Sequence, residues 1–157
     1  MTRRYAVVAL LAFVLALPAM AIAQTPNFTG KWTQDMDKSD PPMGGGRGPG
    51  GPQTLTITQT ATEITLERET PNGVMKTVYK LDGSESVNAM GRGGEVTSKS
   101  AWEGGKLVTK YSRSMGQTTV EVTETRSLEA DGTMTVVSVT KGGPQGDMTR
   151  KMVFKKA

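Results

Sequence analysis

The alternation of hydrophobic and polar residues predicts a chain of short β-strands. Apolar side chains recur at every second position, as at Leu55 and Ile57 and again at Val120 and Val122. A period of two places such residues on one face of a strand, where they can pack against a core. About ten runs of this kind follow one another, and no sustained helical period occurs after residue 24.

Turn signals between these runs favour antiparallel hairpins. Pro-Asn-Gly at 71–73 and Asp-Gly at 131–132 each stand between two strand-like segments. Proline presets the first angle of a turn, and glycine accepts positive φ angles. The pattern predicts an all-β fold, a single antiparallel up-and-down β-barrel of about ten strands, with a β-sandwich as the competing form. We expect the strand around Trp32 to pair with the last strand, residues 148–155, because this closure removes both exposed edges.

The segment at 41–52 is rich in glycine and proline and is predicted to be a flexible loop. Its glycines lose much conformational freedom on ordering, and its prolines lack N–H donors for a ladder. The single Arg47 in it has no aromatic neighbours, so single-stranded nucleic acid is not an expected partner.

The first 23 residues have the features of a secretory signal peptide. Arg3 and Arg4 precede an apolar run at 6–17, and Ala-Ile-Ala at 21–23 forms a small-residue cleavage site. We predict general secretory export with cleavage after Ala23, while the paired arginines leave twin-arginine export as an alternative. The expected location is periplasmic or secreted.

Cleavage leaves one domain, residues 24–157, because 157 − 23 = 134 residues suffice for a single core. Removal of Arg3 and Arg4 lowers the formal net charge from +4 to +2, which argues against nucleic acid as a partner. No transmembrane segment is expected after cleavage, and we expect a monomer.

The chain contains no Cys and no His. Disulfides, thiol nucleophiles, the common transition-metal ligand sets and the usual general base are therefore missing. The ten Met residues are scattered over separate strands and turns, which favours gap-filling in the core over a copper site. We expect no metal, no cofactor and no enzymatic activity. Polar side chains on the outward faces and an aromatic content of 5% argue against an outer-membrane barrel.

Three short motifs resemble the intracellular lipid-binding (fatty-acid-binding) proteins and, more loosely, the lipocalins. They are Asn-Phe-Thr-Gly-Lys-Trp at 27–32, Trp-Glu-Gly at 102–104 and Val-Phe-Lys-Lys-Ala at 153–157. The resemblance implies a barrel that encloses a small hydrophobic ligand. It departs from the family in two ways, because the glycine- and proline-rich loop replaces a helical lid and Met152 and Phe154 replace an Arg-x-Tyr pair that would bind a carboxylate. That family is also cytosolic, whereas this chain carries an export signal.

Side chains that share the predicted inward faces are the candidate ligand contacts. Arg150 could serve as a displaced anchor, and Glu124 is the expected partner of Arg126, because both lie on one face two residues apart. Trp32 is also a candidate core residue, and the arginines could instead lie near strand ends and reach water. The candidate ligand-binding residues are Trp32, Tyr79, Tyr111, Arg113, Arg126, Arg150, Met152 and Phe154.

The sequence therefore predicts an exported, non-catalytic β-barrel that binds a small hydrophobic ligand such as a lipid. The alternative is a ligand-free module of the cell envelope whose filled barrel interacts through its surface. An enzyme that uses inward Arg and Glu residues is a third hypothesis, and nothing in the sequence favours it.

Overall fold

The computed structural model describes residues 25–41, 51–89 and 94–157. The predicted signal peptide and residues 42–50 of the predicted loop lie outside the described residues. Within the described ranges, every regular element is a β-strand, and no helix is long and apolar enough to cross a membrane. The strands are β1 (Gly30–Asp35), β2 (Thr54–Gln59), β3 (Glu63–Thr70), β4 (Gly73–Lys80), β5 (Asp82–Ala89), β6 (Glu95–Glu103), β7 (Lys106–Met115), β8 (Thr118–Leu128), β9 (Met134–Lys141) and β10 (Met148–Lys156).

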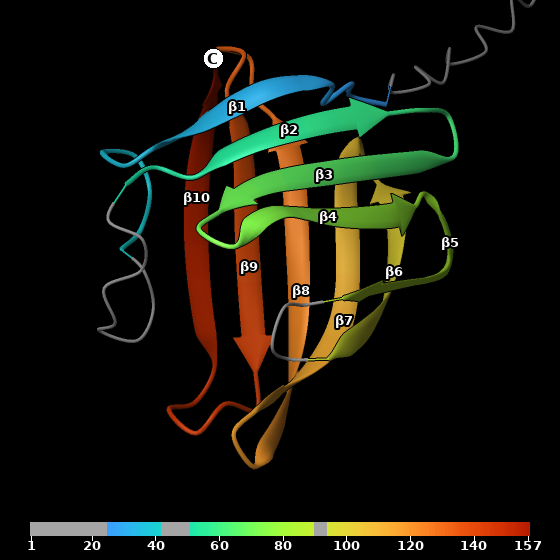
Figure 1. Cartoon of the computed structure of the whole chain (residues 1–157), viewed down its shortest axis with the longest axis vertical. Helices are drawn as coiled ribbons and strands as arrows, with labels where there is room; N and C mark the ends of the chain where they lie inside the picture. The colour runs from blue at the N-terminus through green and yellow to red at the C-terminus, as the bar shows by residue number, and fades with distance from the viewer. Residues whose placement is uncertain (1–24, 42–50, 90–93) are drawn as a thin grey trace, which may run out of the picture.

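The ten strands form one antiparallel sheet that curls into a nearly closed barrel, as predicted. The sheet order is β4-β3-β2-β1-β10-β9-β8-β7-β6-β5. Strands that follow one another in the chain therefore pair, and two places depart from this rule. One is the pairing of β1 with β10, which sets Trp32 opposite Lys156 and Asp35 opposite Val153. It confirms the predicted pairing of these two strands, but it does not remove both edges of the sheet, because β4 and β5 stay unpaired with each other. In Figure 1, β1 to β4 run across the front of β7 to β10.

The second place is the junction of β4 and β5, which are the two edges of the sheet. Side chains bridge this junction where a backbone ladder would otherwise run. The amide of Asn88 accepts a hydrogen bond from Val78 N and donates one to Val78 O, both at 2.8 Å. Ser86 Oγ accepts a bond of 2.8 Å from Lys80 N. These bonds satisfy backbone groups that would otherwise lack partners at the sheet edge.

An apolar core fills one end of the barrel. Phe28, which lies just before β1, and Trp32 are both fully buried. Phe28 stacks on Trp102 with ring centroids 5.9 Å apart, and its carbonyl accepts a hydrogen bond of 2.8 Å from Trp32 Nε1. Gln59 at the end of β2 accepts a bond of 2.9 Å from Phe28 N. The segment before β1 therefore closes this end, and any internal space must lie beyond it.

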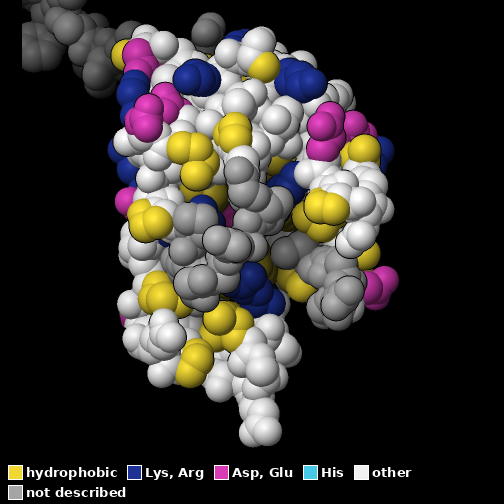
Figure 2. Space-filling view, turned by 60° about the vertical axis from the view of Figure 1, so that its left-hand side comes forward, with side chains coloured by type: hydrophobic (Ala, Val, Ile, Leu, Met, Phe, Trp, Pro, Cys, Tyr) yellow, Lys and Arg dark blue, Asp and Glu magenta, His cyan; other side chains and the backbone are white. Residues whose placement is uncertain are grey.

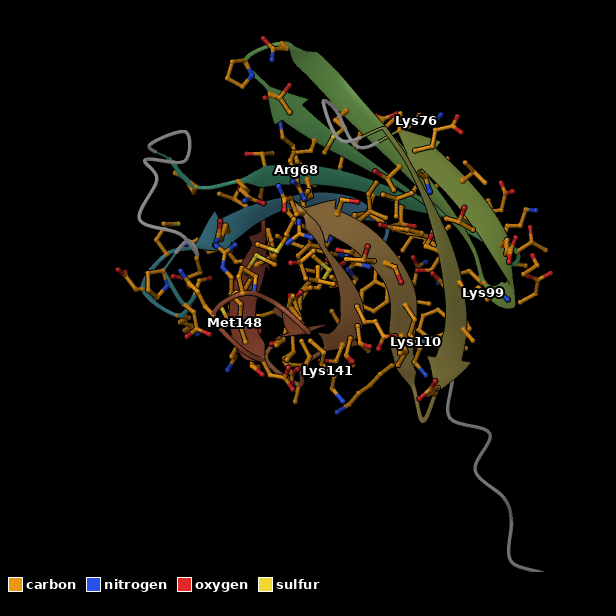
Figure 3. The ribbon with its side chains drawn as sticks, turned by 90° about the horizontal axis from the view of Figure 1, so that it is seen from below. Arg68, Lys76, Lys99, Lys110, Lys141 and Met148 are labelled. Atoms are coloured by element: carbon orange, nitrogen blue, oxygen red, sulfur yellow. The ribbon has the colours of Figure 1, made fainter. Side chains whose placement is uncertain are left out.

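The two faces of the strands differ in charge distribution. Lys76, Lys99, Lys110 and Lys141 are exposed on the outside, whereas Arg68 on β3 points toward the barrel interior when the molecule is seen from below (Figure 3). The alternation predicted from the sequence therefore separates a polar outer surface from an interior that also holds charged groups.

We predict that Phe28→Ala lowers the free energy of unfolding by about 3 to 5 kcal/mol, because it leaves a cavity and removes the stack on Trp102. Urea unfolding followed by circular dichroism measures the change. Val74→Ala is the control, because Val74 is 65% exposed and its truncation should change stability little. Equal stabilities of the two variants would contradict the assignment of Phe28 to the core.

Candidate functional site

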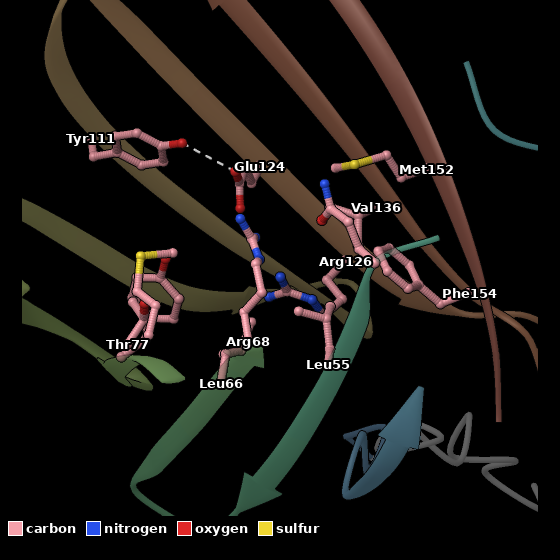
Figure 4. A pocket seen from close by; sticks show the side chains of 13 residues that line it. Leu55, Leu66, Arg68, Thr77, Tyr111, Glu124, Arg126, Val136, Met152 and Phe154 are labelled. Atoms are coloured by element: carbon pink, nitrogen blue, oxygen red, sulfur yellow. Dashed lines mark hydrogen bonds between the residues drawn. The ribbon is translucent and has the colours of Figure 1, made fainter. Parts of the chain in front are cut away.

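A cavity of about 80 Å³ lies in the barrel interior next to the apolar core. Strands from both halves of the sheet contribute to it, because alternate side chains of each strand point inward. Its lining combines aromatic and aliphatic groups with two arginines and one carboxylate (Figure 4). The lining residues are Gln53, Leu55, Leu66, Arg68, Met75, Thr77, Tyr79, Tyr111, Glu124, Arg126, Val136, Met152 and Phe154.

Arg126 is the most enclosed charged group of this site. It lies on the inner face of β8, is only 4% exposed, and its Nε has no hydrogen-bond partner. Among the described residues, no carboxylate lies within 4.0 Å of its guanidinium nitrogens. A buried charge without a partner is costly, so this position favours a group that supplies negative charge.

Glu124 does not pair with Arg126 as the sequence led us to expect. Its Oε1 accepts a hydrogen bond of 3.0 Å from Tyr111 Oη on the adjacent strand β7 (Figure 4). The expected ion pair is wrong because sharing a face two positions apart separates two Cβ atoms by roughly 7 Å, and each long side chain can then turn to a different neighbour. The site therefore retains an unpaired arginine beside a carboxylate that is already hydrogen-bonded.

Arg68 is a charged residue of the cavity lining that the sequence did not point to. It lies on β3 with the same parity as Ile64 and Leu66, two apolar residues that are buried. Extending the inward pattern of that strand by one more step would have identified it. Arg68 is half-buried, and its Nε also lacks a hydrogen-bond partner.

Arg68 and Gln53 also line a wider hollow of about 570 Å³ that adjoins the cavity. The remaining walls of this hollow come from the chain leading into β2 and from the end of β3 with the turn after it. They are Gly51, Pro52, Thr54, Glu69, Thr70 and Pro71. In the space-filling view of Figure 2, basic side chains lie recessed among hydrophobic side chains on the face shown. The cavity thus adjoins a larger space at its Arg68 side.

Five of the eight candidate ligand-binding residues line the cavity. These are Tyr79, Tyr111, Arg126, Met152 and Phe154. The other three lie elsewhere: Trp32 is in the apolar core, Arg113 is exposed on β7, and Arg150 is half-buried on β10 outside the lining. Whether any of the eight contacts a ligand stays a prediction.

Burial keeps the two tyrosines of the cavity protonated. Desolvation, with a smaller contribution from the charge of Glu124, raises the pKa of Tyr79 to about 12. Desolvation, the charge of Glu124 and the hydrogen bond to it raise the pKa of Tyr111 well above its usual value. Neither phenol is therefore a base or a nucleophile near neutral pH. Both act as neutral groups, and Tyr111 donates a hydrogen bond to Glu124.

The raised pKa of Tyr79 predicts a loss of stability in alkaline solution. The unfolded chain releases this proton near pH 10.0 and the folded chain near 12, so the stabilising contribution is complete below pH 10.0 and disappears as the pH rises through about 12. Urea unfolding between these pH values should show that the free energy of unfolding declines less with rising pH for Tyr79→Phe than for the unmodified protein. Identical declines would mean that Tyr79 is not buried.

No protein-family model and no curated protein matches this chain. Among solved structures, it is similar to zebrafish ileal bile acid-binding protein complexed with cholic acid, with a TM-score of 0.64 and 20% identity over 83% of this chain and 98% of that one. It is also similar to the REP1-NXSQ fatty acid transporter, with a TM-score of 0.62 and 15% identity over 82% and 95% of the two chains. A third similar structure is the apo form of Caenorhabditis elegans lipid binding protein 8, with a TM-score of 0.59 and 12% identity over 83% and 95%. The chain therefore has the barrel fold of the fatty-acid-binding and bile-acid-binding proteins, as its three short motifs predicted.

Proposed function

We propose that this protein is an exported, soluble β-barrel that binds a small, mostly hydrophobic molecule with an acidic group and does not transform it. The observation that carries this proposal is Arg126, a nearly fully buried charge that faces a cavity without a carboxylate partner. An acidic group on the ligand would supply the missing negative charge and a charge-assisted hydrogen bond.

The dimensions of the two spaces define how such a ligand would lie. A cavity of about 80 Å³ holds only a small chemical group, whereas the adjoining hollow is about 570 Å³. We infer that the acidic end enters the cavity and that the hydrophobic part extends past Arg68 into the hollow. Leu55, Leu66 and Phe154 offer apolar contacts to the portion nearest the acidic group.

Two further considerations support a binding protein. The similar solved structures are named as bile-acid-binding, fatty-acid-transporting and lipid-binding proteins. The side chains of the cavity also lack an activated nucleophile, since the two tyrosines are neutral and Glu124 already accepts a hydrogen bond.

The alternative is a ligand-free module of the cell envelope that interacts through its surface. The small cavity volume and the densely filled end around Trp32 favour this second candidate. It predicts no saturable binding of amphipathic molecules, so the experiment below distinguishes the two candidates.

We predict that Arg126→Met weakens the binding of 11-(dansylamino)undecanoic acid by about tenfold to a hundredfold, the usual contribution of a hydrogen bond to a charged group. The methyl ester of this probe should bind both proteins equally, because it lacks the negative charge. Fluorescence titration measures both affinities. Arg113→Met is the matched control, since Arg113 is exposed and does not line the cavity.

Two results would contradict this prediction. One is equal binding of the acid and the ester by the unmodified protein, and the other is equal weakening by Arg113→Met. Misfolding is not expected to interfere, because replacing an unpaired buried charge by an apolar side chain of similar length is usually neutral or stabilising. Urea unfolding of Arg126→Met should therefore show an unchanged or higher midpoint.

The proposal of export makes a separate prediction. Expression of the full chain in a Gram-negative host should yield a periplasmic protein that begins at Gln24, because Ala-Ile-Ala at 21–23 matches the preference of signal peptidase for small residues. Intact-mass measurement of the periplasmic fraction identifies the first residue. Recovery of the uncleaved chain from the cytoplasm would contradict export.

A further inference from the structure

The cavity contains an uneven set of charges. Arg68 and Arg126 contribute two positive charges, and Glu124 contributes one negative charge, which leaves an excess of one positive charge among the lining residues. Arg113 and Arg150 lie outside this lining. The charge of Arg113 reaches Tyr111 in the cavity wall, where its effect on the tyrosine pKa is smaller than that of Glu124. In a confined space, an unbalanced charge of this kind selects the charge of what binds there.

Glu124 is fixed in this set, because Tyr111 Oη donates to its Oε1 at 3.0 Å. Its charge acts across the cavity, since it contributes to the raised pKa of both Tyr79 and Tyr111. Figure 4 shows that Arg68 and Arg126 extend into the same space as Glu124. A bound acidic group would therefore meet two attractive charges and one repulsive charge.

We infer that Glu124 makes the site selective for singly charged acidic groups, such as carboxylates, sulfonates or phosphodiesters, over doubly charged phosphate monoesters. This inference rests on the proposed function and adds the charge class of the ligand. A single negative charge on the ligand neutralises the one excess positive charge of the cavity lining. A double charge doubles the attraction of the two arginines and the repulsion of Glu124 alike, but its cost of losing hydration rises roughly with the square of the charge. With Glu124 present, the excess of a single positive charge is too small to offset that cost.

The test compares two probes with the same hydrophobic chain, 1-decanesulfonate and decyl phosphate, below their micellar concentrations. At about pH 8 the sulfonate carries one charge and the phosphate monoester carries nearly two. Isothermal titration calorimetry measures both affinities. The buffer contains about 0.15 M salt, which screens the long-range field of the whole protein. We expect the unmodified protein to bind the sulfonate about tenfold more tightly than the phosphate.

Glu124→Gln keeps the shape and the acceptor oxygen for Tyr111 but removes the charge. It should shift the ratio of the two affinities by about tenfold or more toward decyl phosphate. The matched control is Glu121→Gln, which makes the same charge change on the outer face of β8, where residue 121 is exposed, and should leave the ratio unchanged. Tyr111→Phe removes the hydrogen bond and retains the charge, so the preference for the sulfonate should persist.

If the ratio of the affinities for sulfonate and phosphate in Glu124→Gln stays within about twofold of its value in the unmodified protein, charge selection by Glu124 is overturned. An equal shift in Glu121→Gln would overturn it as well, because the effect would then belong to the net charge of the protein. Failure of both probes to bind the unmodified protein would instead contradict the proposed function, and the inference would fall with it.

Discussion

The pairing of β1 with β10 is the constraint on which the barrel depends. It joins the chain's first and last strands and thereby connects β2 to β4 with β5 to β9 in one sheet. Beyond β1 the contact with β10 continues, because Val153 N donates to Ser39 Oγ at 2.9 Å and Asp40 N donates to Lys151 O at 2.8 Å. Without this junction, the two groups of strands would each expose a second unpaired edge in addition to β4 or β5. The same junction places Phe154 of β10 and Leu55 of β2 in the wall of one cavity.

The opposite side of the barrel is closed by a different kind of interaction. Between β4 and β5, the side chains of Asn88 and Ser86 supply the hydrogen bonds that a neighbouring backbone would otherwise supply. Asn88 lies beside Tyr79 and Tyr111, two residues that also line the cavity. One wall of the site is thus held by a continuous ladder and the other by a few side chains, whose hydrogen bonds each contribute modestly to stability.

Much of the fold follows from local sequence patterns, whereas the site depends on interactions between strands. The alternation of apolar residues and the turn at 71–73 predicted the strands and their order, since both signals are contained in neighbouring residues. Parity alone also placed Tyr79, Tyr111 and Arg126 on the inner faces. It could not show that Glu124 turns to Tyr111 and leaves Arg126 without a carboxylate, because that choice depends on the register of β7 against β8.

Arg126 connects the fold with the proposed function, because the barrel buries its charge and leaves it facing an open cavity. The most direct test of this account is a crystal structure of the protein with a bound long-chain carboxylate. We expect a carboxylate oxygen within about 3 Å of the Arg126 guanidinium, with the hydrophobic chain extending past Arg68. A carboxylate bound on the outer surface, or one directed into solvent while Arg126 stays unpaired, would contradict the account.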